Sequence, residues 1–207
     1  KKVISNALSK GGDYADLYFE HTLSNNSVLM DGKVNQAQSN VAYGVGVRVL
    51  KGDQTGYAFT EIITPEALMN AAGTAANIAN DTGTGFPGEM KELLSPNLYP
   101  VTRSWEDTSI KDKIPFLERA NEKIFALDNK VTKVTASIGD TSSYILFYNS
   151  EGVLACDYRP LVYLSVNCVM EQNGRIENFS VSSSARKGSE FLSDELVDRL
   201  AGEAVEK

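Results

Sequence analysis

The sequence predicts an α+β fold with two similar halves of mainly antiparallel sheet and packed helices. Three observations support this fold class. Apolar residues alternate with a period of two along many stretches, which is typical of strands. Helical spacing is confined to a few shorter segments. The order helix, several strands, helix occurs twice, and this indicates a degenerate internal repeat.

The first half is expected to begin with a short helix at residues 2–10, followed by a strand at 13–21. The polar residues 24–26 predict a turn. Asp31 and Gly32 then predict a tight turn between two short strands, because aspartate and glycine tolerate the backbone angles of such turns.

Residues 43–61 predict a β-hairpin whose first strand has two unlike faces. One face carries β-branched residues, which suit burial on a pleated sheet. The other carries Gly44, Gly46 and Arg48, and glycines at alternate positions of a strand indicate that something approaches the backbone closely. Residues 51–54 supply the turn of this hairpin.

A helix is expected at residues 64–79. Thr64 is a suitable N-cap, Pro65 suits the first turn, and Glu66 lies near the positive end of the helix dipole. Alanines form one narrow side of this helix, so we expect it to lie close on the glycine side of the hairpin.

A connector rich in proline and glycine spans residues 83–108, with one helical turn expected near 90–94. Connectors of this length usually mark a domain boundary or a functional loop. The sequence therefore predicts two lobes, 1–82 and 109–207, joined by the linker 83–108.

The second half is expected to begin with a helix that ends near Leu127 and starts at either Ser109 or Pro115. A last helix begins after Ser193 as its cap. Between them the alternation predicts strands at 131–138, 143–149, 153–170 (broken at residues 159–160) and 175–184.

Composition excludes some functions. The formal net charge is −7, and no cluster of basic residues suits direct binding to nucleic acid. No apolar stretch approaches the roughly 18 residues that span a bilayer, so no membrane role is expected. Cys156 and Cys168 are expected to be reduced and packed, which favours a cytoplasmic location. Both ends of the sequence suggest that it is a piece of a longer protein.

The sequence offers little conventional catalytic chemistry. His21 is the only histidine, so a zinc helix with two histidines is impossible, and an ordinary exposed histidine is the favoured interpretation. Gly83, Gly85 and Gly88 match a dinucleotide-binding pattern, but they do not lie between a strand and a helix. No catalytic residue and no metal ligand is predicted.

Charged residues near the hairpin have two interpretations. Asp16 and Glu20 alternate with tyrosines, as on a solvated strand. Arg48 is expected to form an ion pair with a neighbour such as Asp31 or Glu61. The alternative is that Arg48 and the glycines beside it contact an extended peptide.

The segments "GGDYADLYFEH", "DGKVNQAQSNVAYGVGVRVLKGDQTGYAFTE" and "TPEALMNAAGTAANIA" resemble the N-terminal domain of the TldD/PmbA family. The resemblance is densest from Gly11 to Asn80. It implies a zinc metallopeptidase acting on peptides or unfolded proteins, in a family first described as modulators of DNA gyrase.

The resemblance implies that the zinc site, on an H-E-x-x-x-H helix, belongs to a C-terminal domain absent from this chain. This chain would itself bind no cofactor, and would supply substrate access and a dimer contact in a homodimer or paralogous heterodimer. The motif positions, which form a candidate groove for a peptide or partner, are Asp31, Gly32, Gly44, Gly46, Arg48, Gly56 and Tyr57.

Two other functions remain open. The chain could be a free-standing module that holds a peptide or protein by strand addition without any chemistry. It could also be a regulatory partner of DNA gyrase, because its acidic charge suits a basic protein surface better than DNA.

Overall fold

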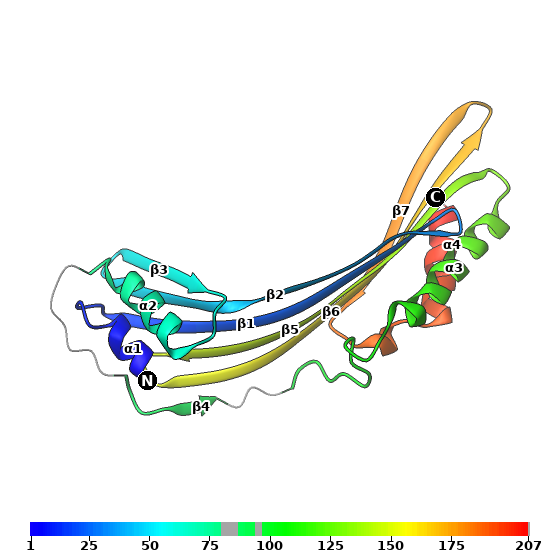
Figure 1. Ribbon diagram of the computed structural model, residues 1–207. Helices are drawn as coiled ribbons and strands as arrows, with labels where there is room; N and C mark the ends of the chain where they lie inside the picture. Colours follow the sequence, from blue (N-terminus) through cyan, green and yellow to red (C-terminus); the bar gives the residue numbers. More distant parts are fainter. Residues whose placement is uncertain (80–86, 94–96, 207) are drawn as a thin grey trace. The chain divides into compact units, whose positions relative to one another are not determined.

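The computed structural model describes residues 1–79, 87–93 and 97–206. These residues form one mainly antiparallel sheet of seven strands with helices packed on it, which confirms the α+β class. The strand order is β3-β2-β1-β5-β6-β4, and β7 also pairs with β6 (Figure 1). The helices and strands are α1 (Lys2–Ala7), β1 (Tyr14–Met30), β2 (Lys33–Lys51), β3 (Gln54–Thr60), α2 (Pro65–Ala76), β4 (Lys91–Leu93), α3 (Ile110–Leu127), β5 (Val131–Asn149), β6 (Val153–Gln172), β7 (Arg175–Ala185), the short 3₁₀ helix η1 (Ser189–Phe191) and α4 (Asp194–Val205).

The repeat is a helix, three strands and a helix, in place of the four or five strands expected. The predicted turn at residues 24–26 lies inside β1, and the predicted break at 159–160 lies inside β6. Polar residues stay in β1 because Asn25 donates to the carboxylate of Asp140 at 2.9 Å. Pro160 is tolerated because β4 pairs with β6 only at residues 153–155 and β7 only from Val162 onward.

A two-residue turn of the same kind occurs in each half, between β1 and β2 in the first and between β6 and β7 in the second. Asp31 and Gly32 have φ angles of 48° and 74°, and Asn173 and Gly174 have 54° and 80°. Two consecutive left-handed residues are the pattern of a two-residue hairpin turn, and asparagine, aspartate and glycine adopt it at least cost. The predicted turn at Asp31 and Gly32 is confirmed.

The chain divides into two compact units, each assembled from three segments. Unit 1 consists of Lys1–Thr22, Val41–Asn97 and Ser143–Tyr158, and unit 2 of Leu23–Asn40, Leu98–Ser142 and Arg159–Lys207. This division differs from the lobes 1–82 and 109–207 expected from the sequence. The linker 83–108 lies partly outside the described residues, which resume at residue 87.

Unit 1 has helices on one side of its sheet, where α1 and α2 lie side by side (Figure 1). Its core is made of Ile4, Ala7, Leu8, Ala15, Leu17, Val47, Val49, Ala71, Ala72, Ala75 and Tyr148. Val47 and Val49 of β2 therefore face the helices. The expectation that α2 covers Gly44 and Gly46 is wrong, because the glycine in contact with the helix is Gly56: a Cβ atom there would lie 2.1 Å from the carbonyl oxygen of Ala75.

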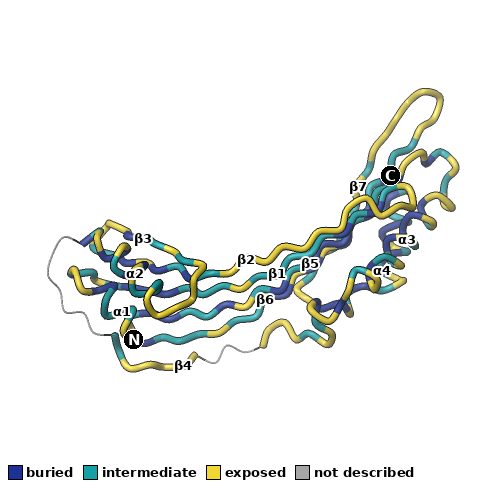
Figure 2. Tube along the Cα trace, viewed as in Figure 1, coloured by how far each residue is buried: buried dark blue, intermediate teal, exposed yellow. Residues whose placement is uncertain are grey.

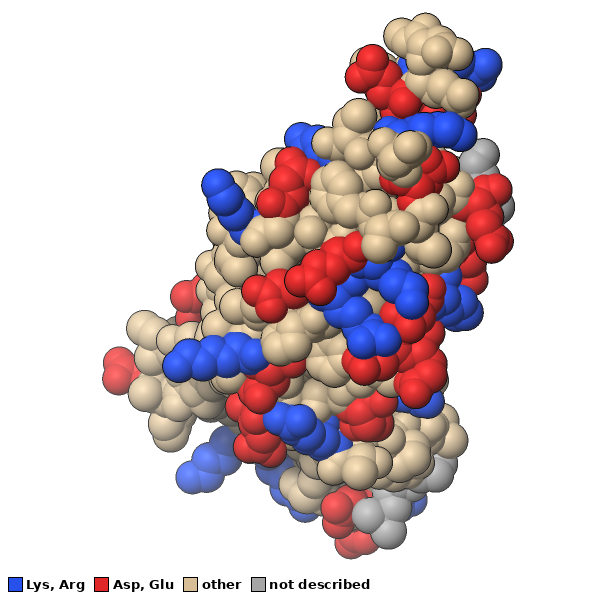
Figure 3. Space-filling view, turned by 90° about the vertical axis from the view of Figure 1, so that its right-hand side faces the viewer, with Lys and Arg blue, Asp and Glu red and all other residues tan. Residues whose placement is uncertain are grey.

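Unit 2 has its own core beneath α3 and α4. Trp105, Leu117, Ile124, Leu164 and Leu200 are among its buried members. The surface over this part mixes Lys and Arg side chains with Asp and Glu side chains on the face that Figure 3 presents. No single sign of charge dominates that face.

The helix starts follow their predicted caps. Thr64 accepts from the amide of Ala67 at the start of α2, and Ser193 accepts from that of Leu196 at the start of α4. Ser109 begins α3 with a capping box that includes Asp112, so of the two expected starts the structure shows the one at Ser109.

Two further expectations concern the connector and the cysteines. The helical turn expected near residues 90–94 is wrong where the structure describes it, since Lys91–Leu93 form β4 parallel to β6. Both cysteines are free; Cys168 is buried and Cys156 is exposed, so only one of them is packed as expected. Among the described helices, none has the length and apolar character needed to cross a membrane.

Candidate functional site

The side of the unit 1 sheet that faces away from α1 and α2 carries the glycines singled out in the sequence. Pairing of β2 with β3 places Arg48 opposite Tyr57 and Gly46 opposite Phe59. Because side chains alternate along a strand, these residues share one side of the sheet. We call this side the glycine face; it comprises Asp16, Tyr18, Glu20, Gly44, Gly46, Arg48, Tyr57 and Phe59.

A hollow of about 230 Å³ lies on the glycine face. It is lined by Tyr18, Glu20, Ala42, Tyr43, Gly44, Val45, Gly46, Tyr57 and Phe59. Tyr57 and Phe59 are 63% and 69% exposed, which is unusual for aromatic side chains. Exposed apolar groups gathered around a hollow mark surfaces that bind other molecules.

The glycines make this hollow possible. A Cβ atom at Gly46 would lie 2.6 Å from the hydroxyl oxygen of Tyr57, and one at Gly44 would lie 3.0 Å from the carbonyl oxygen of Thr60. The ring of Tyr57 therefore lies across Gly46, in the space that a side chain would occupy. Gly44, Gly46 and Tyr57 are brought together as the sequence led us to expect.

Arg48 forms an ion pair on this face. Its Nε and Nη2 atoms donate to Oδ2 of Asp16 at 3.0 and 2.5 Å. The hydrogen bond to Asp16 raises the pKa of Arg48, so the guanidinium remains charged. The ion pair expected from the sequence exists, but its partner is neither Asp31 nor Glu61. Asp16 is also buried rather than solvated, with 4% exposure.

Glu20 lines the hollow with a carboxylate held at one oxygen. The hydroxyl of Thr22 donates to Oε1 of Glu20 at 2.6 Å, and the same hydroxyl lies 2.7 Å from that of Ser143. Within the part of the chain that the structure describes, no Lys or Arg pairs with Glu20. The hollow therefore contains an uncompensated negative charge.

The other candidate groove residues lie elsewhere. Asp31 and Gly32 belong to unit 2, where the Asp31 carboxylate accepts from the amide of Val134 at 2.9 Å and the amide of Gly32 donates to Asn121 at 3.1 Å. Gly56 faces α2. The structure therefore does not gather all seven candidates on the glycine face.

Sequence reasoning missed several lining residues, among them Tyr18, Glu20 and Phe59. Their period of two was visible, since Tyr18 and Glu20 lie two and four residues after Asp16. What the sequence did not show is that β1 lies beside β2, which brings these side chains to Gly44 and Gly46.

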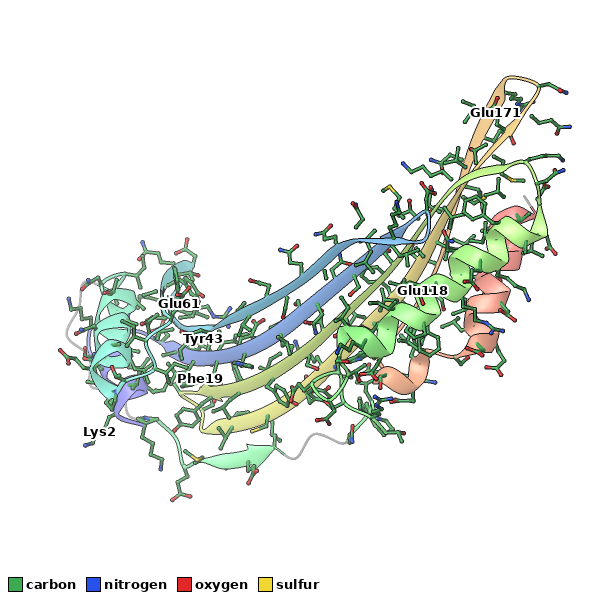
Figure 4. All side chains as sticks on the ribbon, turned by 45° about the vertical axis from the view of Figure 1, so that its right-hand side comes forward. Lys2, Phe19, Tyr43, Glu61, Glu118 and Glu171 are labelled. Carbon is green, nitrogen blue, oxygen red and sulfur yellow. The ribbon has the colours of Figure 1, made fainter. Side chains whose placement is uncertain are left out.

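A second, more apolar hollow of about 530 Å³ also belongs to unit 1. Its lining includes Phe19, His21, Tyr144, Cys156 and Tyr158. The rings of Tyr144 and Tyr158 lie 4.8 Å apart, and that of His21 lies 6.5 Å from the ring of Tyr43. Figure 4 labels Phe19 and Tyr43 on the neighbouring strands β1 and β2. His21 is exposed, as expected.

No metal centre is evident in the described parts of the chain, where no group of three or more His, Cys, Asp or Glu side chains is placed to hold an ion. The zinc site implied by the resemblance was expected in a C-terminal domain and not among these residues. The chemistry that this arrangement supports is binding through aromatic, backbone and carboxylate groups.

Fold and site together define an α+β protein of two similar halves with an aromatic hollow on one side of its sheet. Two family models match this chain: domain 1 of the PmbA/TldA metallopeptidases over residues 15–79, and their central domain over residues 103–207. The chain belongs to this family of metallopeptidases, also known as TldD/PmbA.

Named relatives agree with this assignment. The chain is 33% identical over 195 residues to a metalloprotease TldD homologue of Haemophilus influenzae, covering 90% of this chain and 39% of the relative. It is 26% identical over 199 residues to a metalloprotease of Methanothermobacter thermautotrophicus, covering 94% and 42%. The chain thus spans about two fifths of the length of these relatives.

Solved structures share the fold. A Thermotoga maritima protein provisionally named as a modulator of a DNA gyrase superposes with a TM-score of 0.75 and 23% identity, over 99% of this chain and 46% of that one. TldE from Thermococcus kodakarensis superposes with a TM-score of 0.72 and 15% identity, over 100% and 46%.

Proposed function

We propose that this chain is the non-catalytic, N-terminal part of a TldD/PmbA-type zinc metallopeptidase, and that it guides peptides or unfolded proteins toward a catalytic domain in the rest of the enzyme. Membership of the family and the partial coverage of metalloprotease relatives support this proposal. The zinc and its ligands would belong to the remaining part. The enzyme would act in the cytoplasm.

The observation that carries the proposal is the hollow on the glycine face. Gly44 and Gly46 carry no side chains that would fill it, and Tyr57, whose ring lies over Gly46, presents a large exposed apolar surface together with Phe59. An extended peptide can place a side chain among these rings and run along the strands. The main chain of a folded protein is already paired in its own secondary structure and is not free to run along the strands in this way.

A subunit contact is the second part of the proposal. We expect a homodimer or a heterodimer with a paralogue of the same family. Residues 33–43 of β2 are exposed along their whole length, as Figure 2 shows, and β3 pairs with β2 only from Val45 onward. An unpaired strand edge of this kind can pair with a strand of another chain.

The same edge supports a second candidate function, a module that holds a peptide purely by strand addition. The edge is polar, with Gln36 and Gln38 bonded to each other at 3.0 Å. The two functions differ in the part of β2 that is used. A proline at Asn35 or Ser39 would weaken strand addition, whereas changes at Tyr57 and Phe59 would weaken capture on the glycine face.

The proposal is tested by measuring binding of a fluorescein-labelled, reduced and carboxymethylated protein to the chain by fluorescence anisotropy. We expect binding of this unfolded probe and no binding of the same protein in its native fold. We expect Tyr57→Ala to bind the unfolded probe about tenfold more weakly, since burial of one aromatic ring in a complex contributes on that order. Peptidase activity and one bound zinc ion per chain should both be absent from the purified chain.

Two results would contradict the proposal. Equal binding of the native and the unfolded probe would show that the surface does not select extended chains. One zinc ion per chain, measured by elemental analysis, would show that the catalytic metal belongs here. Size-exclusion chromatography with light scattering tests the subunit contact, for which a monomer at all concentrations would be the opposing result.

A further inference from the structure

We propose that the hollow on the glycine face accepts a basic side chain, lysine or arginine, of an extended peptide. This inference rests on the proposed function and names the substrate feature that this chain selects. Three properties of the hollow carry it: its aromatic walls, its uncompensated carboxylate and its size.

The walls suit a cation that carries an apolar stem. Tyr18, Tyr57 and Phe59 come from two strands, β1 and β3, on either side of β2 and surround the glycine floor. The methylene groups of lysine or arginine can pack on such rings, and the charge gains further from the ring faces. A hollow lined by several aromatic side chains is a recurrent way to bind organic cations.

The carboxylate of Glu20 determines the sign of the charge. Thr22 holds one of its oxygens, and the positive charge nearest to it on the glycine face, that of Arg48, is bonded to Asp16. No basic residue is among those that line the hollow in the described chain. A basic side chain would neutralise Glu20, whereas an acidic one would meet a like charge.

The size of the hollow limits the occupant to one side chain. Its volume of about 230 Å³ is smaller than the 300–1,000 Å³ typical of sites for whole small ligands. The absence of a side chain at Gly46 lets the ring of Tyr57 lie low over β2 as one wall of the hollow, a position that a Cβ atom at Gly46 would prevent. The peptide main chain would remain outside, along the strand.

The test compares labelled heptapeptides that differ at one central position, with serine and threonine elsewhere. The central residue is lysine, norleucine or glutamate. Norleucine keeps an unbranched apolar stem and removes the charge. Anisotropy titrations of the 207-residue chain give a Kd for each. We expect the lysine peptide to bind about tenfold more tightly than the norleucine peptide, and the glutamate peptide most weakly.

Glu20→Gln is the decisive variant, because glutamine can still accept from Thr22 but carries no charge. We expect it to reduce the preference for lysine over norleucine to less than about twofold, with little change for norleucine. Glu118→Gln is the matched control: it removes the same charge from an exposed position on α3, in unit 2 (Figure 4), and should keep the preference.

The outcomes separate this inference from the proposed function. If the lysine and norleucine peptides bind equally, the hollow takes apolar side chains and the inference is wrong, while peptide capture stands. If Glu20→Gln and Glu118→Gln lower the preference for lysine over norleucine equally, that preference depends on the overall charge of the chain and not on the hollow, and the inference is wrong. If the unfolded probe itself does not bind, the proposed function is wrong, and the inference that rests on it is wrong as well. Circular dichroism of each variant confirms that it is folded.

Discussion

The Nζ atom of Lys113 and the carboxylate of Asp140 form an ion pair in which both side chains are almost entirely buried, with 2% and 1% exposure. Lys113 also lies over the ring of Trp105, 5.4 Å from its centroid, and Asn25 donates to the other oxygen of Asp140. Buried pairs of this kind cost much when one partner is removed, because the other remains charged without compensation.

We therefore expect Lys113→Met to lower the free energy of unfolding by about 3–5 kcal/mol, measured by urea denaturation. The double variant Lys113→Met with Asp140→Asn should be more stable than the single variant, because no buried charge is left. Lys111→Met, at an exposed position of the same helix, is the control and should have little effect. A double variant less stable than Lys113→Met alone would contradict this account.

The pair of Arg48 and Asp16 is expected to stabilise unit 1. Arg48→Ala leaves the buried Asp16 carboxylate without its two donors, so we expect a loss of about 1–3 kcal/mol in the free energy of unfolding. Lys51→Ala is the comparison, because Lys51 and Asp13 form an exposed pair worth about 0–1 kcal/mol. Equal losses for the two variants in thermal unfolding would show that burial of Asp16 does not matter.

Glycine substitutions should separate stability from binding. Gly56→Ala places a Cβ atom against the main chain of α2, so the helix must shift, and we expect about 1–3 kcal/mol of destabilisation. Gly46→Ala displaces only the exposed ring of Tyr57, so it should weaken peptide binding more than it lowers stability. Gly202→Ala, on α4, meets no atom within 4 Å and should be neutral or stabilising. Unchanged peptide binding by Gly46→Ala would count against the glycine-face hollow.

The loss of folding stability at acidic pH should depend on Asp198. The hydrogen bond from Arg119 holds the pKa of Asp198 below its ordinary value of 3.8. A carboxylate with a lowered pKa in the folded state contributes stability that is present above that ordinary value and is lost as the pH falls through the folded pKa. Asp198→Asn should therefore flatten the decline below pH 3.8, as measured by urea titrations at several pH values. A decline of unchanged steepness would be the opposing result.

The two cysteines should differ in reactivity. Cys156 is exposed, whereas burial raises the pKa of the Cys168 thiol and keeps it protonated. We expect an aromatic disulfide reagent to modify Cys156 in the folded chain and Cys168 only after denaturation. Cys156→Ser should abolish the fast reaction. Rapid modification of both thiols in the native state would show that the unit 2 core opens readily.

Helix starts and tight turns were predictable because they depend on local chemistry. Thr64 and Ser193 cap the helices that follow them, and Asp31 with Gly32 forms the turn expected of that dipeptide. Strand lengths were not predictable in the same way. Asn25 looks like part of a turn until its partner Asp140 is known, and that partner lies more than a hundred residues away.

The candidate site was predictable within the hairpin of residues 43–61 and not beyond it. Gly44, Gly46 and Tyr57 belong to one hairpin, so local alternation places them together. Glu20 enters through the pairing of β1 with β2 far from their turn at Asp31 and Gly32, and the turn expected at residues 24–26 concealed that β1 continues so far. The same limit applies to Arg48: an ion pair with a carboxylate could be predicted, but not that the carboxylate belongs to Asp16 on β1.

The long strands have a consequence for attempts to divide the protein. Because β1, β2, β5 and β6 each contribute residues to both compact units, a gene split between α2 and α3 gives two polypeptides that each hold incomplete portions of both. Neither product has a whole core of its own. Reconstitution would require the two fragments to be co-expressed, so that each supplies the strands the other lacks.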